Sequence, residues 1–311
     1  MITEIEERYV KAVEKASASI VSVRAGISPR GSCCGPSRRM GLTSGVVLDK
    51  EGYVITSHHA VCQMENVTVI MSNGHVFSGK VVGEDQRTDI AVIKIESDEM
   101  VPAELGDSDT LKVGQPILAM GNPLGLPGGP VVTSGIISFI PRGPFMGQSG
   151  MAILATDASV NPGNGGGPLV NLDGMVVAIN ATRAPFAEGM SLAIPINMAK
   201  GIAEQIIKHG KVQRSWLGIT AYDITPPLAY QFQLPDNDGV FIAEVLPKGP
   251  AEGAGLKMGD VILALDDKHV GSVTDLLVTL SGMSSGQEIA VKMRRNGRTE
   301  DVHVTLGTRP Y

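Results

Sequence analysis

The chain has 311 residues, 43% of them apolar, with 26 basic and 32 acidic side chains and a formal net charge of −6. Such a composition can build a sizeable core and excludes a disordered chain, and the acidic balance argues against a nucleic-acid-binding protein. The length favours two domains, and no apolar run is long enough to predict a transmembrane helix.

The first predicted element is an N-terminal helix within residues 1–18. Apolar residues recur at helical spacing from Ile5 to Ala16, and Thr3 with Glu6 matches a capping box. The segment is acidic and lacks the basic-then-apolar layout of a secretory signal. We therefore expect a cytoplasmic protein, or an exported one whose signal has been removed.

A loop rich in glycine, proline and serine follows at residues 26–41. It carries arginines but no acidic residue, which fits either a solvated loop or a contact with an acidic partner. Cys33 and Cys34 lie in this loop, and Cys62 lies beyond it. Three cysteines, two of them adjacent, are not typical of a disulfide framework, and no Cys/His spacing predicts a metal site.

The central part of the chain is predicted to be a β domain over residues 19–197. Short strands alternate there with turns, and no long helical pattern interrupts them, which is typical of a barrel or a sandwich. A helical connector is expected over residues 198–213, with Asn197 as its N-cap and Gly210 as its end.

The remaining residues, 214–311, are predicted to form a separate α+β domain. Four strand-like runs alternate there with short helical stretches near 226–232 and 273–282.

Three stretches in the β domain carry residues suited to acyl-transfer chemistry: 56–60 with His59, 87–91 with Asp89, and the glycine-rich 161–169. The order His, Asp, glycine-rich turn is that of the trypsin-like proteases. An imidazole is a suitable base at neutral pH, and a carboxylate can hold its tautomer and orientation. A glycine-rich turn allows backbone N–H groups to converge on a developing oxyanion.

These residues closely resemble the HtrA family of serine proteases. Residues 157–171 read DASVNPGNGGGPLVN, against a family pattern of roughly DAxINPGNSGGPLVN, and the likeness extends from about residue 19 to 308. The resemblance implies a mainly β protein with a chymotrypsin-like double β-barrel followed by a PDZ domain. It also implies a serine endopeptidase of protein quality control that acts on unfolded or misfolded polypeptides, needs no cofactor or metal, and assembles as a homotrimer.

The resemblance assigns His59 as the base and Asp89 as the orienting acid. The adjacent His58 is the alternative base, and the family's TxxH spacing selects His59. The oxyanion hole is assigned to Gly163, Asn164 and Gly165.

One position departs from the family pattern, because its serine falls on Gly165. Glycine supplies no nucleophile, so we predict that this chain is inactive. The change is either one that holds a protease inert, natural or made in the laboratory, or one inherited by a non-proteolytic, chaperone-like or peptide-binding relative. Ser159 and Cys62 are nearby hydroxyl and thiol groups, but each fits a structural role better than that of a substitute nucleophile.

The resemblance also assigns a substrate pocket and a regulatory arginine. Leu192, Ala193 and Ile194 match the strand that lines the primary pocket, which implies a small or medium aliphatic preference, although Leu192 and Ala193 would serve equally as core. Arg142 matches an arginine that relays activation to the oxyanion loop, and its alternative is a solvated loop position.

The C-terminal module resembles a PDZ domain. Leu217, Gly218 and Ile219 would bind the carboxylate of a C-terminal peptide, and the strand after them would pair with the peptide backbone. Leu276 and Leu280 are candidates for its apolar pocket, and helical spacing makes core positions the alternative.

Overall fold

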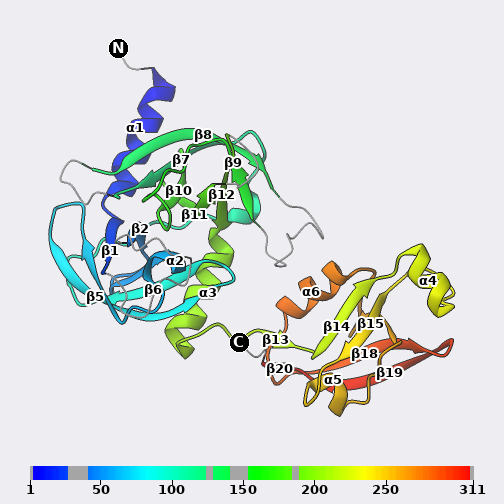
Figure 1. The fold of residues 1–311 in the computed structure, drawn as a ribbon. Coiled ribbons are helices and arrows are strands. Elements are labelled where there is room, and N and C mark those ends of the chain that lie inside the picture. Colours follow the sequence, from blue (N-terminus) through cyan, green and yellow to red (C-terminus); the bar gives the residue numbers. More distant parts are fainter. Residues whose placement is uncertain (1–2, 27–40, 124–128, 141–152, 184–188, 309–311) are drawn as a thin grey trace. The chain divides into compact units, whose positions relative to one another are not determined.

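The structure is a computed structural model that describes residues 3–26, 41–123, 129–140, 153–183 and 189–308 (Figure 1). The predicted Arg142, Cys33 and Cys34 lie outside these residues. The described chain falls into two compact units, one up to Val212 and one from Gln213.

The first unit contains two closed antiparallel barrels, each with six strands, as the fold prediction required (Figure 1). The strand order of the first barrel is β1-β2-β3-β6-β5-β4, and that of the second is β10-β11-β12-β9-β8-β7. The first barrel consists of β1 (Ile20–Ala25), β2 (Gly41–Val47), β3 (Tyr53–Ser57), β4 (Asn66–Ile70), β5 (Val76–Asp85) and β6 (Ile90–Ile95). The second consists of β7 (Pro116–Gly121), β8 (Val131–Phe139), β9 (Leu154–Thr156), β10 (Pro168–Asn171), β11 (Val176–Arg183) and β12 (Ser191–Pro195).

Each barrel encloses its own apolar core, because alternate strand residues point inward. A further cluster, which includes Ile55, Leu118 and Ile179, draws residues from both barrels. The single turn of helix α2 (His58–Val61) follows β3, and the 3-10 turn η1 (Ser108–Thr110) precedes β7.

Two longer helices pack on this shared core. The predicted N-terminal helix is confirmed as α1 (Glu4–Ser17), with the Thr3–Glu6 capping box in place. Its Ala12 and Ala16 are buried in the cluster shared by both barrels. The apolar face of α1 therefore packs largely on its own unit.

The second long helix, α3 (Ile196–His209), starts earlier than the sequence indicated. Pro195 occupies the N-cap position, so the expectation that Asn197 caps the helix is wrong. Asn197 lies within the first turn and donates from Nδ2 to Oδ1 of Asp107 at 2.7 Å. Gly210 ends the helix in the left-handed region, as predicted. The helix buries Ile202 and Ile206 against the barrels.

The second unit has the α+β composition expected of a PDZ domain. Its main sheet has the order β14-β15-β16-β18-β19, β17 adds to β16, and β13 pairs with β20. The strands are β13 (Ser215–Trp216), β14 (Ile219–Asp223), β15 (Val240–Val245), β16 (Val261–Leu265), β17 (Lys268–His269), β18 (Glu288–Arg295), β19 (Arg298–Thr305) and β20 (Gly307–Thr308). The helices are α4 (Pro226–Phe232), α5 (Pro250–Gly253) and α6 (Val273–Ser281).

One expectation about the cysteines is wrong. Cys62, at the C-terminal end of α2, is disulfide-bonded, although the odd count and adjacent pair gave no such indication. Among the described residues, no helix is both long and apolar enough to span a membrane.

Candidate active site

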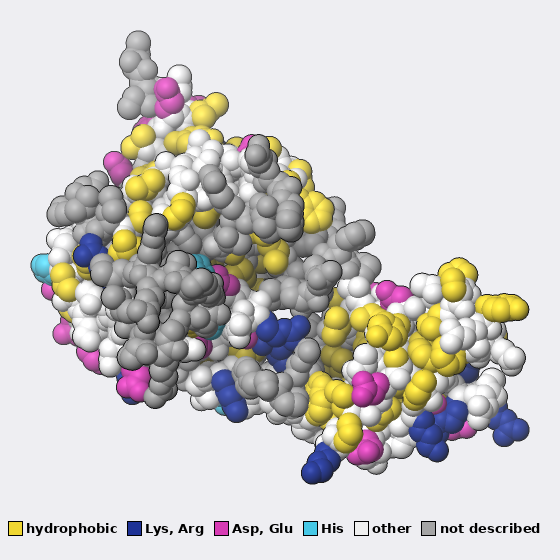
Figure 2. Space-filling view, in the orientation of Figure 1, with side chains coloured by type: hydrophobic (Ala, Val, Ile, Leu, Met, Phe, Trp, Pro, Cys, Tyr) yellow, Lys and Arg dark blue, Asp and Glu magenta, His cyan; other side chains and the backbone are white. Residues whose placement is uncertain are grey.

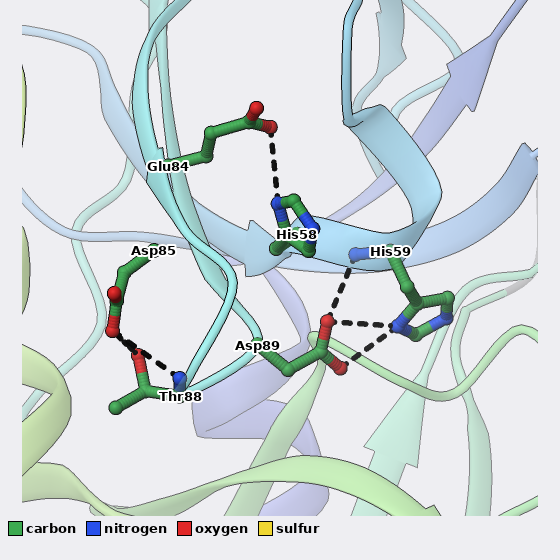
Figure 3. Close-up of polar contacts among 6 residues, drawn as sticks. All are labelled: His58, His59, Glu84, Asp85, Thr88 and Asp89. Atoms are coloured by element: carbon green, nitrogen blue, oxygen red, sulfur yellow. Dashed lines mark hydrogen bonds and ion pairs between the residues drawn. The ribbon is translucent and has the colours of Figure 1, made fainter. Parts of the chain in front are cut away.

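The imidazole of His59 and the carboxylate of Asp89 face each other in the first barrel (Figure 3). Nδ1 of His59 lies 2.8 Å from Oδ2 and 3.0 Å from Oδ1 of Asp89. The backbone N–H of His59 also donates to Oδ1, at 2.8 Å. His59 sits on α2 after β3, and Asp89 sits in the turn before β6, so the pairing of β3 with β6 brings the two together.

This contact determines the proton affinity of the base. The hydrogen bond to Asp89 raises the pKa of His59 above its ordinary value of 6.5, and partial burial of the ring opposes that rise. With Nδ1 held by the carboxylate, Nε2 is the nitrogen left to exchange a proton with a reacting group.

The glycine-rich segment 161–167 forms a tight turn in the second barrel. The N–H of Asn164 donates to the carbonyl of Asn161 at 2.9 Å. Pro162 and Gly163 occupy the two central positions, and Gly163 has φ +97°, which is the requirement of a type II turn. The Asn164 N–H is thus used inside the turn, whereas the N–H groups of Gly163 and Gly165 donate no hydrogen bond among the described residues.

The first barrel holds this turn directly. The carbonyl of Gly165 accepts from the Thr43 hydroxyl at 2.6 Å and from the Ser44 N–H at 2.9 Å. The Ser44 hydroxyl donates to the carbonyl of Gly163 at 2.7 Å. From the second barrel, Nδ2 of Asn180 donates to the carbonyls of Met120 and Pro168, both at 3.1 Å. Five hydrogen bonds therefore hold the carbonyls of Gly163 and Gly165 and the flanking strands, and none of them uses the N–H groups of Gly163 and Gly165.

Gly165 faces the imidazole across the interface between the barrels. A Cβ atom built on Gly165 would lie 3.3 Å from the carbonyl oxygen of Ala181, 3.5 Å from Oγ of Ser57 and 3.7 Å from Cε1 of His59. Neither Ser57 nor Ala181 was identified from the sequence. Their proximity to Gly165 depends on the pairing of strands, which no local sequence motif predicts.

The side chains of the two adjacent histidines have different partners. His58 is buried and pairs with Glu84 through Nδ1 at 3.1 Å, so it does not reach Asp89 with its side chain (Figure 3). Ser159 is exposed on the segment before the turn, and Cys62 is disulfide-bonded. Of the two candidate bases, His59 is the one whose ring contacts Asp89 and also lies beside Gly165 of the glycine-rich turn.

The pocket candidates lie on β12, which pairs with β11 and β9. Ala193 and Ile194 are buried, and Leu192 is partly exposed. Ala193 belongs to the core of the second barrel. Leu192 is therefore the member of the trio that has side-chain surface to offer a substrate.

In the second unit, the predicted peptide-binding residues lie around an edge strand and a helix. β14 is the edge strand of its sheet and is contacted by α6. Gly218, just before β14, has φ +82°, and its carbonyl accepts from the N–H of Leu246 at 2.9 Å. Leu276 and Leu280 of α6 are only 3% and 8% exposed and belong to the core.

Other apolar residues on the edge strand β14 and on α6 do have exposed surface. Ile219 and Ala221 on β14 and Val273 on α6 are partly buried against the core of the unit. Hydrophobic side chains also gather on the face of this unit drawn in Figure 2. Tyr222 and Tyr230 are exposed aromatic side chains of the same unit.

Sequence comparison agrees with both units. Residues 43–179 match the family model of a trypsin-like peptidase domain, and residues 216–306 match that of a PDZ domain. Probable periplasmic serine endoproteases called DegP-like are similar over most of the chain. The one from Marinomonas sp. (strain MWYL1) is 38% identical over 276 residues, 88% of this chain. The one from Halomonas elongata is 39% identical over 289 residues, 91% of this chain. The chain spans only 58% and 60% of the length of these two relatives.

Solved structures match over nearly the full chain. The HtrA-type protease AlgW with a decapeptide has a TM-score of 0.85 and 30% identity, over 97% of this chain and 99% of that one. The serine endoprotease from Yersinia pestis has a TM-score of 0.78 and 32% identity, over 97% and 98%.

Two barrels that meet at a His–Asp pair and a glycine-rich turn, followed by a PDZ module, define a trypsin-like serine protease scaffold. Within that class, the chain belongs to the HtrA/DegP-like family.

Proposed function

We propose that this chain is an HtrA-type protein that engages unfolded or misfolded polypeptides but does not cleave them, because glycine stands at the nucleophile position. One observation carries the proposal. Residue 165 faces the ring of His59, with 3.7 Å between its Cβ position and Cε1, yet has no side chain. The contact between His59 and Asp89 supports the assignment of base and orienting acid, and the N–H groups of Gly163 and Gly165, which donate no hydrogen bond among the described residues, support that of an oxyanion hole.

The missing hydroxyl accounts for a very large loss of rate. Removing the nucleophile of a Ser-His-Asp site lowers kcat by roughly 10⁶, which corresponds to about 8 kcal/mol of activation free energy. The neighbouring hydroxyl of Ser57 belongs to a residue that is only 1% exposed, which leaves it poorly placed to attack a peptide carbonyl. Hydrolysis would then depend on water alone.

The PDZ unit supplies the second part of the function. An edge strand beside a helix fits the addition of a C-terminal peptide as an extra strand. A homotrimer and a role in protein quality control follow from the family. The disulfide at Cys62 favours an oxidising compartment, in keeping with the periplasmic names of the relatives.

The decisive experiment compares three proteins on unfolded casein: the chain as it stands, Gly165→Ser, and Gly165→Ser with His59→Ala. We expect cleavage only by the Gly165→Ser protein. Cleavage by the unaltered chain, or by the His59→Ala double variant, would contradict the assignment of the site. A Gly165→Ser protein that is folded yet inactive would favour a relative that has lost more than its nucleophile and acts by binding alone.

A further inference from the structure

His58 has an arrangement that the chemistry at His59 does not by itself explain. Its side chain is 8% exposed, and its Nδ1 atom lies 3.1 Å from Oε2 of Glu84 (Figure 3). A carboxylate accepts hydrogen bonds, so Nδ1 carries the proton and donates it to Glu84. The other ring nitrogen, Nε2, is buried and has no hydrogen-bond partner in the part of the chain that the structure describes. A buried polar atom without a partner costs folding free energy, so its presence needs a reason.

The reason lies in what His58 joins. Its side chain bonds to Glu84 near the end of β5, and its backbone N–H donates to the carbonyl of Asp89 at 3.0 Å. The next residue is His59, whose ring bonds to the carboxylate of Asp89. His58 therefore connects α2 to both sides of the turn between β5 and β6.

Hydrogen bonds within the turn also hold it. The N–H and hydroxyl of Thr88 both donate to Oδ2 of the buried Asp85. Asp89 then takes φ +57°, in the left-handed region that few residues other than glycine and Asx adopt. These contacts fix the shape of the turn, but not its distance from α2. The side-chain contact between His58 and Glu84 joins α2 to the β5 side of the turn, and the contacts of Asp89 join α2 to its β6 side (Figure 3).

We propose that His58 and Glu84 form a positioning pair that holds α2 against the β5–β6 turn and so keeps the ring of His59 within hydrogen-bond distance of Asp89. The inference rests on the roles of His59 and Asp89 given under Proposed function. It does not depend on whether serine at residue 165 restores cleavage, because the contact between His59 and Asp89 exists in the chain as it stands.

A rival explanation is that the charge of Glu84 acts on His59 through space. The two explanations differ in what they require of residue 84. A positioning pair requires an acceptor of full length that reaches Nδ1 of His58. A charge effect requires only a carboxylate. Glu84→Gln keeps the acceptor and removes the charge, whereas Glu84→Asp keeps the charge and withdraws it by one methylene.

The chain offers a matched control on the same barrel. His75 and Glu99 form another histidine–glutamate pair, with Nδ1 2.6 Å from Oε2, but both side chains are about half exposed. Neither residue contacts His59 or Asp89. Glu99→Asp makes the same chemical change as Glu84→Asp at a pair that bears no relation to the site.

The test measures the pKa of His59 by NMR titration of its ring protons in the unaltered chain and in each variant. Because the bond to Asp89 is what raises this pKa, loosening it should lower the pKa toward 6.5. We expect this fall in Glu84→Asp and not in Glu84→Gln or Glu99→Asp. A fall in Glu84→Gln with none in Glu84→Asp would establish the charge effect and overturn the proposal, as would no change in Glu84→Asp.

A second measurement uses the Gly165→Ser protein. There Glu84→Asp should lower kcat about tenfold with little change in KM, and Glu84→Gln should retain most of the activity. An equal loss in Glu84→Asp and Glu99→Asp would contradict the proposal. If Gly165→Ser is inactive, that result counts against the proposed function alone, and the titration decides the positioning role.

Discussion

Gly163 lies so close to Pro123 that a Cβ atom added to the glycine would collide with the Cβ of the proline. The same residue has φ +97°. Glycine is therefore required at position 163 for both space and backbone conformation. Gly165, two residues later, has neither a positive φ nor a Cβ position closer than 3.3 Å to another residue. The backbone conformation does not demand glycine at the nucleophile position, and a serine there requires only a small shift of the Ala181 carbonyl.

This contrast gives the first prediction. In the Gly165→Ser protein, Gly163→Ala should lower kcat/KM by about 10² to 10³, because it displaces one of the two free N–H groups of the turn. The matched control is Gly165→Ala in the unaltered chain, which should leave the thermal unfolding midpoint nearly unchanged. Full activity of the Gly163→Ala variant would show that this N–H does not stabilise an oxyanion.

The second prediction concerns pH. The base acts only when it is neutral, so kcat/KM of the Gly165→Ser protein should rise with pH and reach half its maximum above 6.5, because Asp89 raises the pKa of His59. A raised pKa means that the fold favours the protonated ring. Its stabilising contribution is therefore complete below pH 6.5 and is lost as the pH rises through the folded-state pKa.

As the pH rises from 6.5 through the folded-state pKa of His59, kcat/KM should therefore increase while the stability contributed by the His59–Asp89 contact decreases. Asp89→Asn should shift the midpoint of any residual activity downward. A midpoint at or below 6.5 with Asp89 in place would contradict the assigned contact.

The third prediction concerns the stability of the second unit. Asp260 is 1% exposed, and its two oxygens accept from Nε and Nη2 of Arg295 at 2.7 and 2.6 Å. Arg295→Ala leaves that carboxylate without its cation. We expect a loss of about 3 kcal/mol, the lower end for a broken buried pair, because Arg295 itself is partly exposed.

The neighbouring Arg294 provides the control. It pairs with Asp236, whose side chain is 47% exposed, so Arg294→Ala should cost less than about 1 kcal/mol. Trp216, the single tryptophan of the chain, lies in this unit and reports its unfolding by fluorescence in urea. Equal losses in the two variants would mean that the burial of Asp260 does not govern the energy of the pair.

The sequence predicted those parts of the protein that local motifs encode. The HtrA-type segments around His59, Asp89 and Gly165 led to both barrels and the PDZ unit, and the Thr3–Glu6 pair located the first helix. Contacts that depend on strand pairing were not accessible. The bracing of Gly165 by Thr43, for example, joins residues 122 positions apart. No sequence signal separates such pairs from the many other serines, threonines and glutamates of the chain.

The disulfide at Cys62 was missed for a related reason. Cysteine counting is informative when the residues are even in number and regularly spaced, and here neither condition holds. The start of α3 was misplaced by two residues because Asn197 is a common capping residue, whereas its amide instead bonds to Asp107, 90 positions earlier.

The fourth prediction concerns assembly. We expect a homotrimer in sedimentation at micromolar concentration. Most of the apolar face of α1 packs on its own unit, but Ile5 and Val10 remain 68% and 46% exposed. If α1 contributes to the interface, Ile5→Glu with Val10→Glu should weaken the trimer without lowering the unfolding midpoint. A monomer at these concentrations would reject the expectation.

The last prediction concerns the peptide groove of the PDZ unit. The partly buried Ile219, Ala221 and Val273 offer apolar surface beside the edge strand β14. The full chain should therefore bind peptides that end in an apolar residue, and amidation of the terminal carboxylate should weaken binding at least tenfold. Fluorescence anisotropy of a labelled peptide measures both. Equal binding of the acid and the amide would contradict the assignment of Leu217, Gly218 and Ile219 as the residues that bind the terminal carboxylate.

A pair of glycines isolates that loop from general strain. Gly218 and Gly255 both have φ +82°, so alanine is equally disfavoured by the backbone at either position. A Cβ at Gly218 would also press to 3.1 Å against Gly249, whereas a Cβ at Gly255 meets nothing within 4 Å. Gly218→Ala should thus abolish most of the preference for the free carboxylate, and Gly255→Ala should retain it although the same backbone strain lowers its stability. If both variants keep the preference, the carboxylate is bound elsewhere than at Leu217, Gly218 and Ile219.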